Sequence, residues 1–168
     1  MFGFAFIFLM KNKQMSTSKK MITYLAEMES MIDNHEVTKI NISKSSVGWH
    51  LDHNLKVINN VVKAIQKSDP EAYKSNFSFL GKVFFTLGFF PRGKAKAPKH
   101  VKPPGVVVKA DIINQLKIAK TNIKVITSLD KNAYFKHPLF GNINTQRVNR
   151  FLELHTNHHL KIMRDILK

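Results

Sequence analysis

Two histidines, His155 and His159, stand four residues apart near the end of the chain. Residues at this spacing share one face of a helix and lie within about 6 Å of each other, so both imidazoles can reach one ion. They continue an apolar stripe made of Val148, Leu152, Ile162 and Ile166. Because two histidines at core positions are costly to bury without a shared partner, the pattern indicates a metal site. His158 falls on the flank of this stripe, beside the site or on the surface.

A metal needs at least a third protein ligand, and the segment Trp49-His50-Leu51-Asp52-His53 offers two candidates. His50 lies inside the apolar arc of its predicted helix and His53 lies at the edge, so periodicity slightly favours His50. His53 is better placed if a groove between helices holds the ion, and the residues alone leave both open. Three neutral histidines leave coordination positions for water and substrate, as in a catalytic site. Zinc is the first expectation, with nickel, iron and manganese as alternatives.

The other candidate residues have a structural and a functional interpretation. Asp52 and Asn157 could orient imidazoles, although exposed residues on a helix look the same in sequence. His137 lies in a predicted loop before the last helix, where anchoring of the loop is favoured over a catalytic role. The chain has no cysteine, which excludes disulfides, thiolate metal sites and a cysteine nucleophile. Any metal must therefore bind to histidine or carboxylate.

The elements that would position these side chains are helices. The chain has 168 residues, enough for one domain with its own core. Apolar residues recur every three or four positions in four long stretches, and an aromatic stretch, 77–90, is expected to be helical as well. This pattern predicts an all-α fold, a four-helix bundle, without strands. The first long helix is expected from Ser16 or Thr17 to Asp33, with an apolar face made of Ile22, Leu25, Met28 and Ile32. The other three are expected from Ser45 or Ser46 to Lys67, from Val108 to Leu129, and from Asn144 or Thr145 to Lys168.

The N-terminal residues 1–10 form an apolar run that is too short to span a bilayer. No basic residue precedes the run and no small-residue cleavage site follows it, so it does not fit a secretion signal. We expect residues 1–15 to be an extension outside the fold, with Met15 or Met21 as alternative translation starts, and residues 16–168 to form the single domain. The competing interpretation is a membrane-surface anchor supported by neighbouring lysines.

The chain carries 27 Lys and Arg against 11 Asp and Glu, a formal net charge of +16. Such a charge permits binding to nucleic acid, anionic lipid or an acidic small molecule without choosing among them. Residues 72–110 contain no acidic residue, and the proline-rich, lysine-rich part 91–109 is expected to be a long crossover connection. A solvated loop is favoured here over a dedicated binding surface, and nucleic acid ranks low as a partner because the segment has no aromatic residues to stack bases.

Two short motifs together resemble a known family. Gly48-Trp49-His50-Leu51-Asp52-His53 in an early helix and His155-Thr156-Asn157-His158-His159-Leu160 in the last helix resemble the DinB-like and YfiT-like superfamily of metal-dependent proteins. His137-Pro138-Leu139-Phe140-Gly141 is similar to the HPxFG segment of one bacterial branch of that superfamily. The similarity covers about residues 16–168. The chain departs from better-known members after the paired histidines, where Leu160-Lys161-Ile162-Met163 replaces a Gly-Gln pair.

The resemblance implies a four-helix bundle with a three-histidine metal site at His53, His155 and His159, which moves the choice from His50 to His53. His50, His158 and His137 are then neighbours of the site or alternative ligands. The implied function is that of a divalent-metal-dependent transferase or hydrolase on a small molecule, with a low-molecular-weight thiol as one candidate co-substrate. A basic, non-catalytic binding module for nucleic acid or anionic surfaces is the alternative. We expect a cytoplasmic protein without a transmembrane segment. A homodimer is compatible with the sequence.

Overall fold

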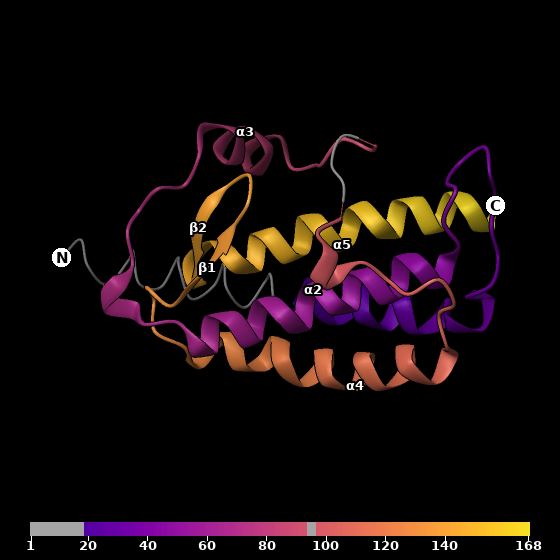
Figure 1. Cartoon of the computed structure of the whole chain (residues 1–168), viewed down its shortest axis with the longest axis horizontal. Coiled ribbons are helices and arrows are strands. Elements are labelled where there is room, and N and C mark those ends of the chain that lie inside the picture. The colour runs from indigo at the N-terminus through magenta and orange to yellow at the C-terminus, as the bar shows by residue number, and fades with distance from the viewer. Residues whose placement is uncertain (1–18, 94–96) are drawn as a thin grey trace.

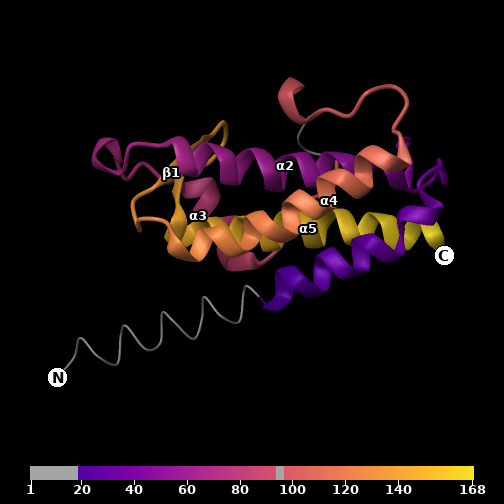
Figure 2. The same ribbon diagram turned by 90° about the horizontal axis from the view of Figure 1, so that it is seen from below.

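The computed structural model describes residues 19–93 and 97–168. In these ranges four helices run side by side along the molecule, and a short helix and a hairpin lie against one side of them (Figures 1 and 2). The four helices are residues 19–30, α2 (Val47–Lys67), α4 (Lys109–Val125) and α5 (Thr145–Leu167). The mainly helical architecture is therefore as predicted, while the predicted extension 1–15 and the first helix start lie outside the described residues.

Ion pairs place helix 19–30 next to both α4 and α5. Glu27 accepts from Arg164 of α5 at 2.6 Å, and Glu29 accepts from Lys120 of α4 at 2.6 Å. The side that faces the core carries Met21, which is 2% exposed, whereas Ile22 is 52% exposed. Leu25, Met28 and Ile32 of the predicted apolar face are buried, whereas the prediction was wrong for Ile22, because Met21 takes its place on the buried face.

The core lies between α2, α4 and α5. Its fully buried side chains are large aliphatic residues, each contributing about 1.5–3 kcal/mol through removal from water. They include Leu51, Leu55, Ile58, Ile112, Leu152 and Leu160. α4 ends at Val125 and continues as a single 3-10 turn, Ile126–Ser128, so the helix predicted to reach Leu129 is shorter by its last turn. Among the described helices, none is long and apolar enough to cross a membrane.

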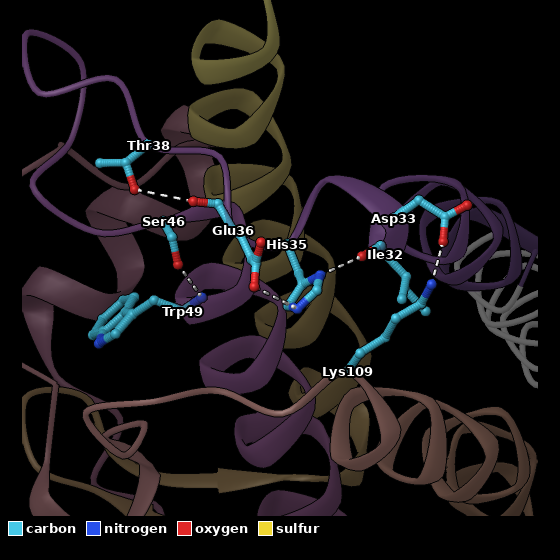
Figure 3. Close-up of polar contacts among 8 residues, drawn as sticks. All are labelled: Ile32, Asp33, His35, Glu36, Thr38, Ser46, Trp49 and Lys109. Carbon is cyan, nitrogen blue, oxygen red and sulfur yellow. Dashed lines mark hydrogen bonds and ion pairs between the residues drawn. The ribbon is translucent and has the colours of Figure 1, made fainter.

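The start of α2 is fixed by the turn that precedes it (Figure 3). The Ser46 hydroxyl accepts from the backbone N–H of Trp49 at 3.2 Å and so caps the helix. The backbone N–H of Gly48 donates to the His35 carbonyl at 2.7 Å, and a Cβ at Gly48 would lie 2.7 Å from that same oxygen. Gly48 therefore lets the turn approach closely, which sets where His50 and His53 enter the core.

The aromatic stretch forms α3 (Phe79–Leu87), shorter than the predicted 77–90. The Ser78 side chain caps its start, and Gly88, with φ of 77°, ends it in the left-handed conformation that glycine adopts without strain. Phe77, Phe84, Phe85 and Phe90 pack their rings around Phe140. The long connection from α3 to α4 contains one 3-10 turn, η3 (Lys99–Val101), in the residues the structure describes.

A two-stranded antiparallel hairpin precedes α5, which corrects the expectation of an all-α fold. β1 (Tyr134–His137) pairs with β2 (Gly141–Asn144), and Tyr134 lies opposite Asn144. Gly141, with φ of 75°, makes the turn back, and its neighbour Asn142 donates its backbone N–H to the Asn76 side chain at 2.6 Å. Strands of four residues are too short to show alternation, so periodicity could not reveal them.

Candidate metal centre

Three histidines from two helices come together in the core. His53 lies on α2, and His155 and His159 lie one turn apart on α5. One ring nitrogen of each lies within 4.8 Å of the others, and the ring centroids are 4.6–5.3 Å apart. The structure thus assembles the three residues that the family resemblance implies. Histidines this close can converge on one divalent ion, for which imidazole nitrogen is a common ligand.

Two of these rings have their protonation fixed by oxygen acceptors. Nδ1 of His53 donates to the Val101 carbonyl at 2.9 Å. Nδ1 of His155 donates to Oδ1 of Asn54 at 2.8 Å, while the Asn54 amide nitrogen donates to the Met28 sulfur. A carbonyl oxygen accepts and cannot donate, so the proton of each neutral ring lies on Nδ1. Nε2 of both rings therefore keeps the lone pair that a metal requires.

The third ring, His159, contacts a fourth histidine. Nδ1 of His159 and Nδ1 of His50 are 3.0 Å apart, and Nε2 of His50 is 3.0 Å from the Ser43 hydroxyl. If Nε2 of His159 holds an ion, its proton must lie on Nδ1 and His50 must accept it. His50 then carries its own proton on Nε2 and donates to Ser43. His50 therefore lies one hydrogen bond outside the three-histidine cluster, in a position to orient His159.

Burial keeps the cluster uncharged. It lowers the pKa of His155 and of His159 well below the ordinary value, and the neighbouring histidines lower both further. Burial also lowers the pKa of His50 to about 4 and that of His53, although the bond to Val101 opposes the shift of His53. Neutral imidazoles with a free lone pair are the form that binds a metal, so no proton has to be displaced at neutral pH.

No carboxylate joins the cluster within the described residues. Asp52, considered above as a residue that orients an imidazole, instead accepts from Lys56 and from Gln115, both at 2.6 Å. Buried Glu153 accepts from Lys20 and from Arg150. Asn157 makes no hydrogen bond to an imidazole in the part of the chain that the structure describes. A divalent ion and the three neutral histidines that bind it would therefore carry a net charge of +2.

Beside the cluster lies a cavity of about 890 Å³. The three histidines are among the residues that line it, together with aromatic side chains from α2, α5, the hairpin and the segment after α3. Trp49 stacks on His53 with ring centroids 5.1 Å apart and also lines the cavity. A volume of this size accommodates a small organic molecule beside an ion.

The two remaining candidate histidines line the cavity without joining the cluster. Nδ1 of His158 donates to the Phe90 carbonyl at 3.0 Å, which fastens the segment after α3 to α5. His137 ends β1 and stacks on Phe140 with ring centroids 4.3 Å apart. Both side chains face the same cavity as the cluster.

Sequence reasoning missed three partners of the histidines: Asn54, Ser43 and the Val101 carbonyl. The role of Asn54 could have been inferred from the sequence, because a polar side chain on the apolar face of a helix needs a buried partner. In the structure Asn54 has no exposed surface. The sequence gives no indication of Ser43 or of the Val101 carbonyl as partners, because serines in turns and backbone carbonyls occur at many positions. Val101 belongs to the basic connection, so this segment contributes to the site and is more than a solvated loop.

No family model, curated protein or solved structure matches the chain.

Proposed function

We propose that the protein is a divalent-metal-dependent enzyme of the DinB-like type that acts on a small molecule in the cavity beside the three histidines. The observation that carries this proposal is the orientation of the rings. Nδ1 of His53 and of His155 is occupied by an oxygen acceptor, and Nδ1 of His159 by His50, so the three Nε2 atoms remain for an ion. Packing of the rings in the core would not by itself require that Nε2 is free in all three histidines.

The ligand set favours zinc, with nickel, iron and manganese as alternatives. Three protein ligands leave at least one position for water or substrate, which distinguishes catalytic from closed structural zinc sites. A zinc ion held by neutral ligands lowers the pKa of a bound water or thiol and makes it a nucleophile at neutral pH. We propose a transferase or hydrolase reaction on this basis, with a low-molecular-weight thiol as a candidate co-substrate.

The chain's own residues would prepare this site before substrate arrives. Asn54, His50 and the Val101 carbonyl hold the ring orientations, and Trp49 packs against His53. The aromatic side chains of the cavity give the cluster a partly apolar surrounding, in which electrostatic interactions are stronger than in bulk water. No carboxylate belongs to the cluster among the described residues, and the nearby Asp52 is paired with Lys56, so the positive charge of a bound ion would be little reduced by negative side chains.

The test is the metal content of the protein purified without an affinity tag. We expect about one equivalent of zinc by mass spectrometry of the acid-digested protein. Alanine at His53, His155 or His159 should lower the content severely, because each removal leaves two ligands. The matched control is His100→Ala, which replaces an exposed histidine at the rim of the cavity.

Circular dichroism on each variant separates loss of metal from loss of fold. Full metal content in all three cluster variants would refute the site. Zinc bound by His53→Ala but lost in His50→Ala would show that His50 is the ligand from α2.

A further inference from the structure

His137 has one ring nitrogen committed to the hairpin. Its Nδ1 accepts the backbone N–H groups of Leu139 and Phe140, both at 3.2 Å. A nitrogen that accepts these donors carries no proton, so the proton of the neutral ring lies on Nε2. The ring is held in place by stacking on Phe140, at 4.3 Å between centroids and an interplanar angle of 11°. The hairpin thus presents an oriented N–H donor.

This donor belongs to the cavity of the proposed metal site. His137 is a cavity-lining residue, and its Nε2 has no hydrogen-bond partner among residues 19–93 and 97–168. The ring of Phe151 is near both His137 and the cluster, with its centroid 5.2 Å from that of His137 and 5.8 Å from that of His155. The free N–H of His137 and the cluster are therefore two of the polar groups that line one mainly apolar cavity. Burial lowers the pKa of His137 to about 4, so the ring is an uncharged donor at neutral pH.

The charge of the cavity selects the acceptor that this donor would meet. No Asp or Glu is among the described residues that line the cavity, whereas Lys136 is. A divalent ion in the cluster would add positive charge that no acidic side chain among these described lining residues balances. An anionic acceptor is favoured in such surroundings over a cationic or neutral one. The aromatic walls, formed among others by Phe90, Phe135 and Phe151, suit an apolar body.

We propose that the cavity binds small apolar carboxylates, with the body between the aromatic walls and a carboxylate oxygen accepting from Nε2–H of His137. This assignment names the ligand class of the site proposed above and in that respect rests on it. His137 is then a specificity-determining residue, because a hydrogen bond to a charged acceptor contributes more than one to a neutral acceptor.

The probe is 4-phenylbutyrate, and its amide serves as an uncharged compound of the same shape. Isothermal titration with each is carried out on the protein kept free of metal by a chelator and again on the zinc-loaded protein. The key variant is His137→Asn, because Oδ1 of asparagine takes the place of Nδ1 as acceptor for the two backbone N–H groups while the Nε2–H donor is lost. His35→Asn, a half-buried histidine outside the cavity, is the matched control.

We expect the carboxylate to bind at least tenfold more tightly than the amide in both forms of the unmodified protein. In His137→Asn the affinity for the carboxylate should fall about tenfold or more, and the affinity for the amide less. A purely structural role of His137 would weaken both compounds equally. An equal loss for the two compounds, unchanged carboxylate affinity, or an amide that binds as tightly as the acid would each overturn the proposal. So would the absence of binding by either compound.

A measurement on the unmodified protein covers the case in which His137→Asn does not fold. In a ¹⁵N–¹H spectrum of the imidazoles, His137 can be recognised by its proximity to the Phe140 ring. Its Nε2 proton should shift downfield when 4-phenylbutyrate is added, and a proton that does not move would contradict the proposal. Zinc binding is scored separately, so a chain that takes up the acid through His137 but no zinc refutes the metal-dependent function alone.

Discussion

Replacing His50 by alanine should weaken zinc binding about ten- to a hundredfold without abolishing the site. His50 contacts no ion in the proposed arrangement. Its Nδ1 accepts the proton that His159 must carry on Nδ1 when Nε2 of His159 binds zinc. In His50→Ala that N–H group is left in a buried space without an acceptor, and the His159 ring can turn.

The size of the effect follows from one lost hydrogen bond at a buried ligand. Leaving a buried donor without a partner costs about 1–3 kcal/mol, and each 1.4 kcal/mol changes the affinity tenfold. Removal of His159 itself costs more, because a metal–nitrogen bond is lost. Ser43→Ala affects only the far end of the same chain of hydrogen bonds, at Nε2 of His50, so we expect its effect to stay below tenfold.

The assay is a competition for zinc against a chromophoric chelator at pH 7.5, with stoichiometry and affinity fitted together. The expected order of affinity is unmodified protein, Ser43→Ala, His50→Ala and His159→Ala, with one zinc per chain in the first three. His50→Ala with unchanged affinity would refute the orienting role. His50→Ala with no bound zinc would show that this side chain is itself a ligand.

Three further results are expected. The free energy of unfolding of the metal-free protein should fall as the pH drops below about 6.5, because the unfolded chain then protonates histidines that burial keeps neutral in the fold. His50 and His137, each with a pKa of about 4, contribute up to about 1.4 kcal/mol per pH unit each. Urea titrations at pH 7.5 and 5 in the presence of chelator measure the difference. Equal stability at both pH values would contradict this. Gly141→Ala should destabilise the fold by about 2 kcal/mol or more, since φ is 75° and the new Cβ would overlap the Asn76 carbonyl, whereas Gly105→Ala, with no atom within 4 Å, should change the melting temperature little. Deletion of residues 1–14 should leave the melting temperature nearly unchanged, and a large loss of stability would show that the predicted extension packs on the domain.

The helices and the histidine pair of α5 could be predicted because both depend on local spacing. His155 and His159 are four residues apart, and a helix brings such residues to one face whatever else surrounds it. The choice between His50 and His53 could not be made from the helical wheel. Residues 50–55 of α2 are all buried, so this part of the helix has no exposed side against which to define an edge.

The hairpin and the partners of the rings depend on contacts between distant segments. His155 meets Asn54 and His53 meets Val101 only after α2, α5 and the connection before α4 have packed. The turn between the strands depends on Gly141 and on the side chain of His137, which accepts two backbone N–H groups of its own loop. No periodic pattern encodes such contacts, and Pro138 in the segment suggested only an irregular loop.

The bond between His53 and the Val101 carbonyl also bears on how quickly an ion could be exchanged. Val101 and Pro103 are buried, but Lys99, His100, Lys102 and Pro104 around them are exposed. A stretch held by so few buried groups opens at a much smaller free energy than the helices do. Each opening removes the acceptor from His53 and uncovers one wall of the cavity. Zinc exchange should therefore occur at a rate similar to that of amide hydrogen exchange in residues 99–102. Both rates should be far higher than the rate of unfolding of the whole chain.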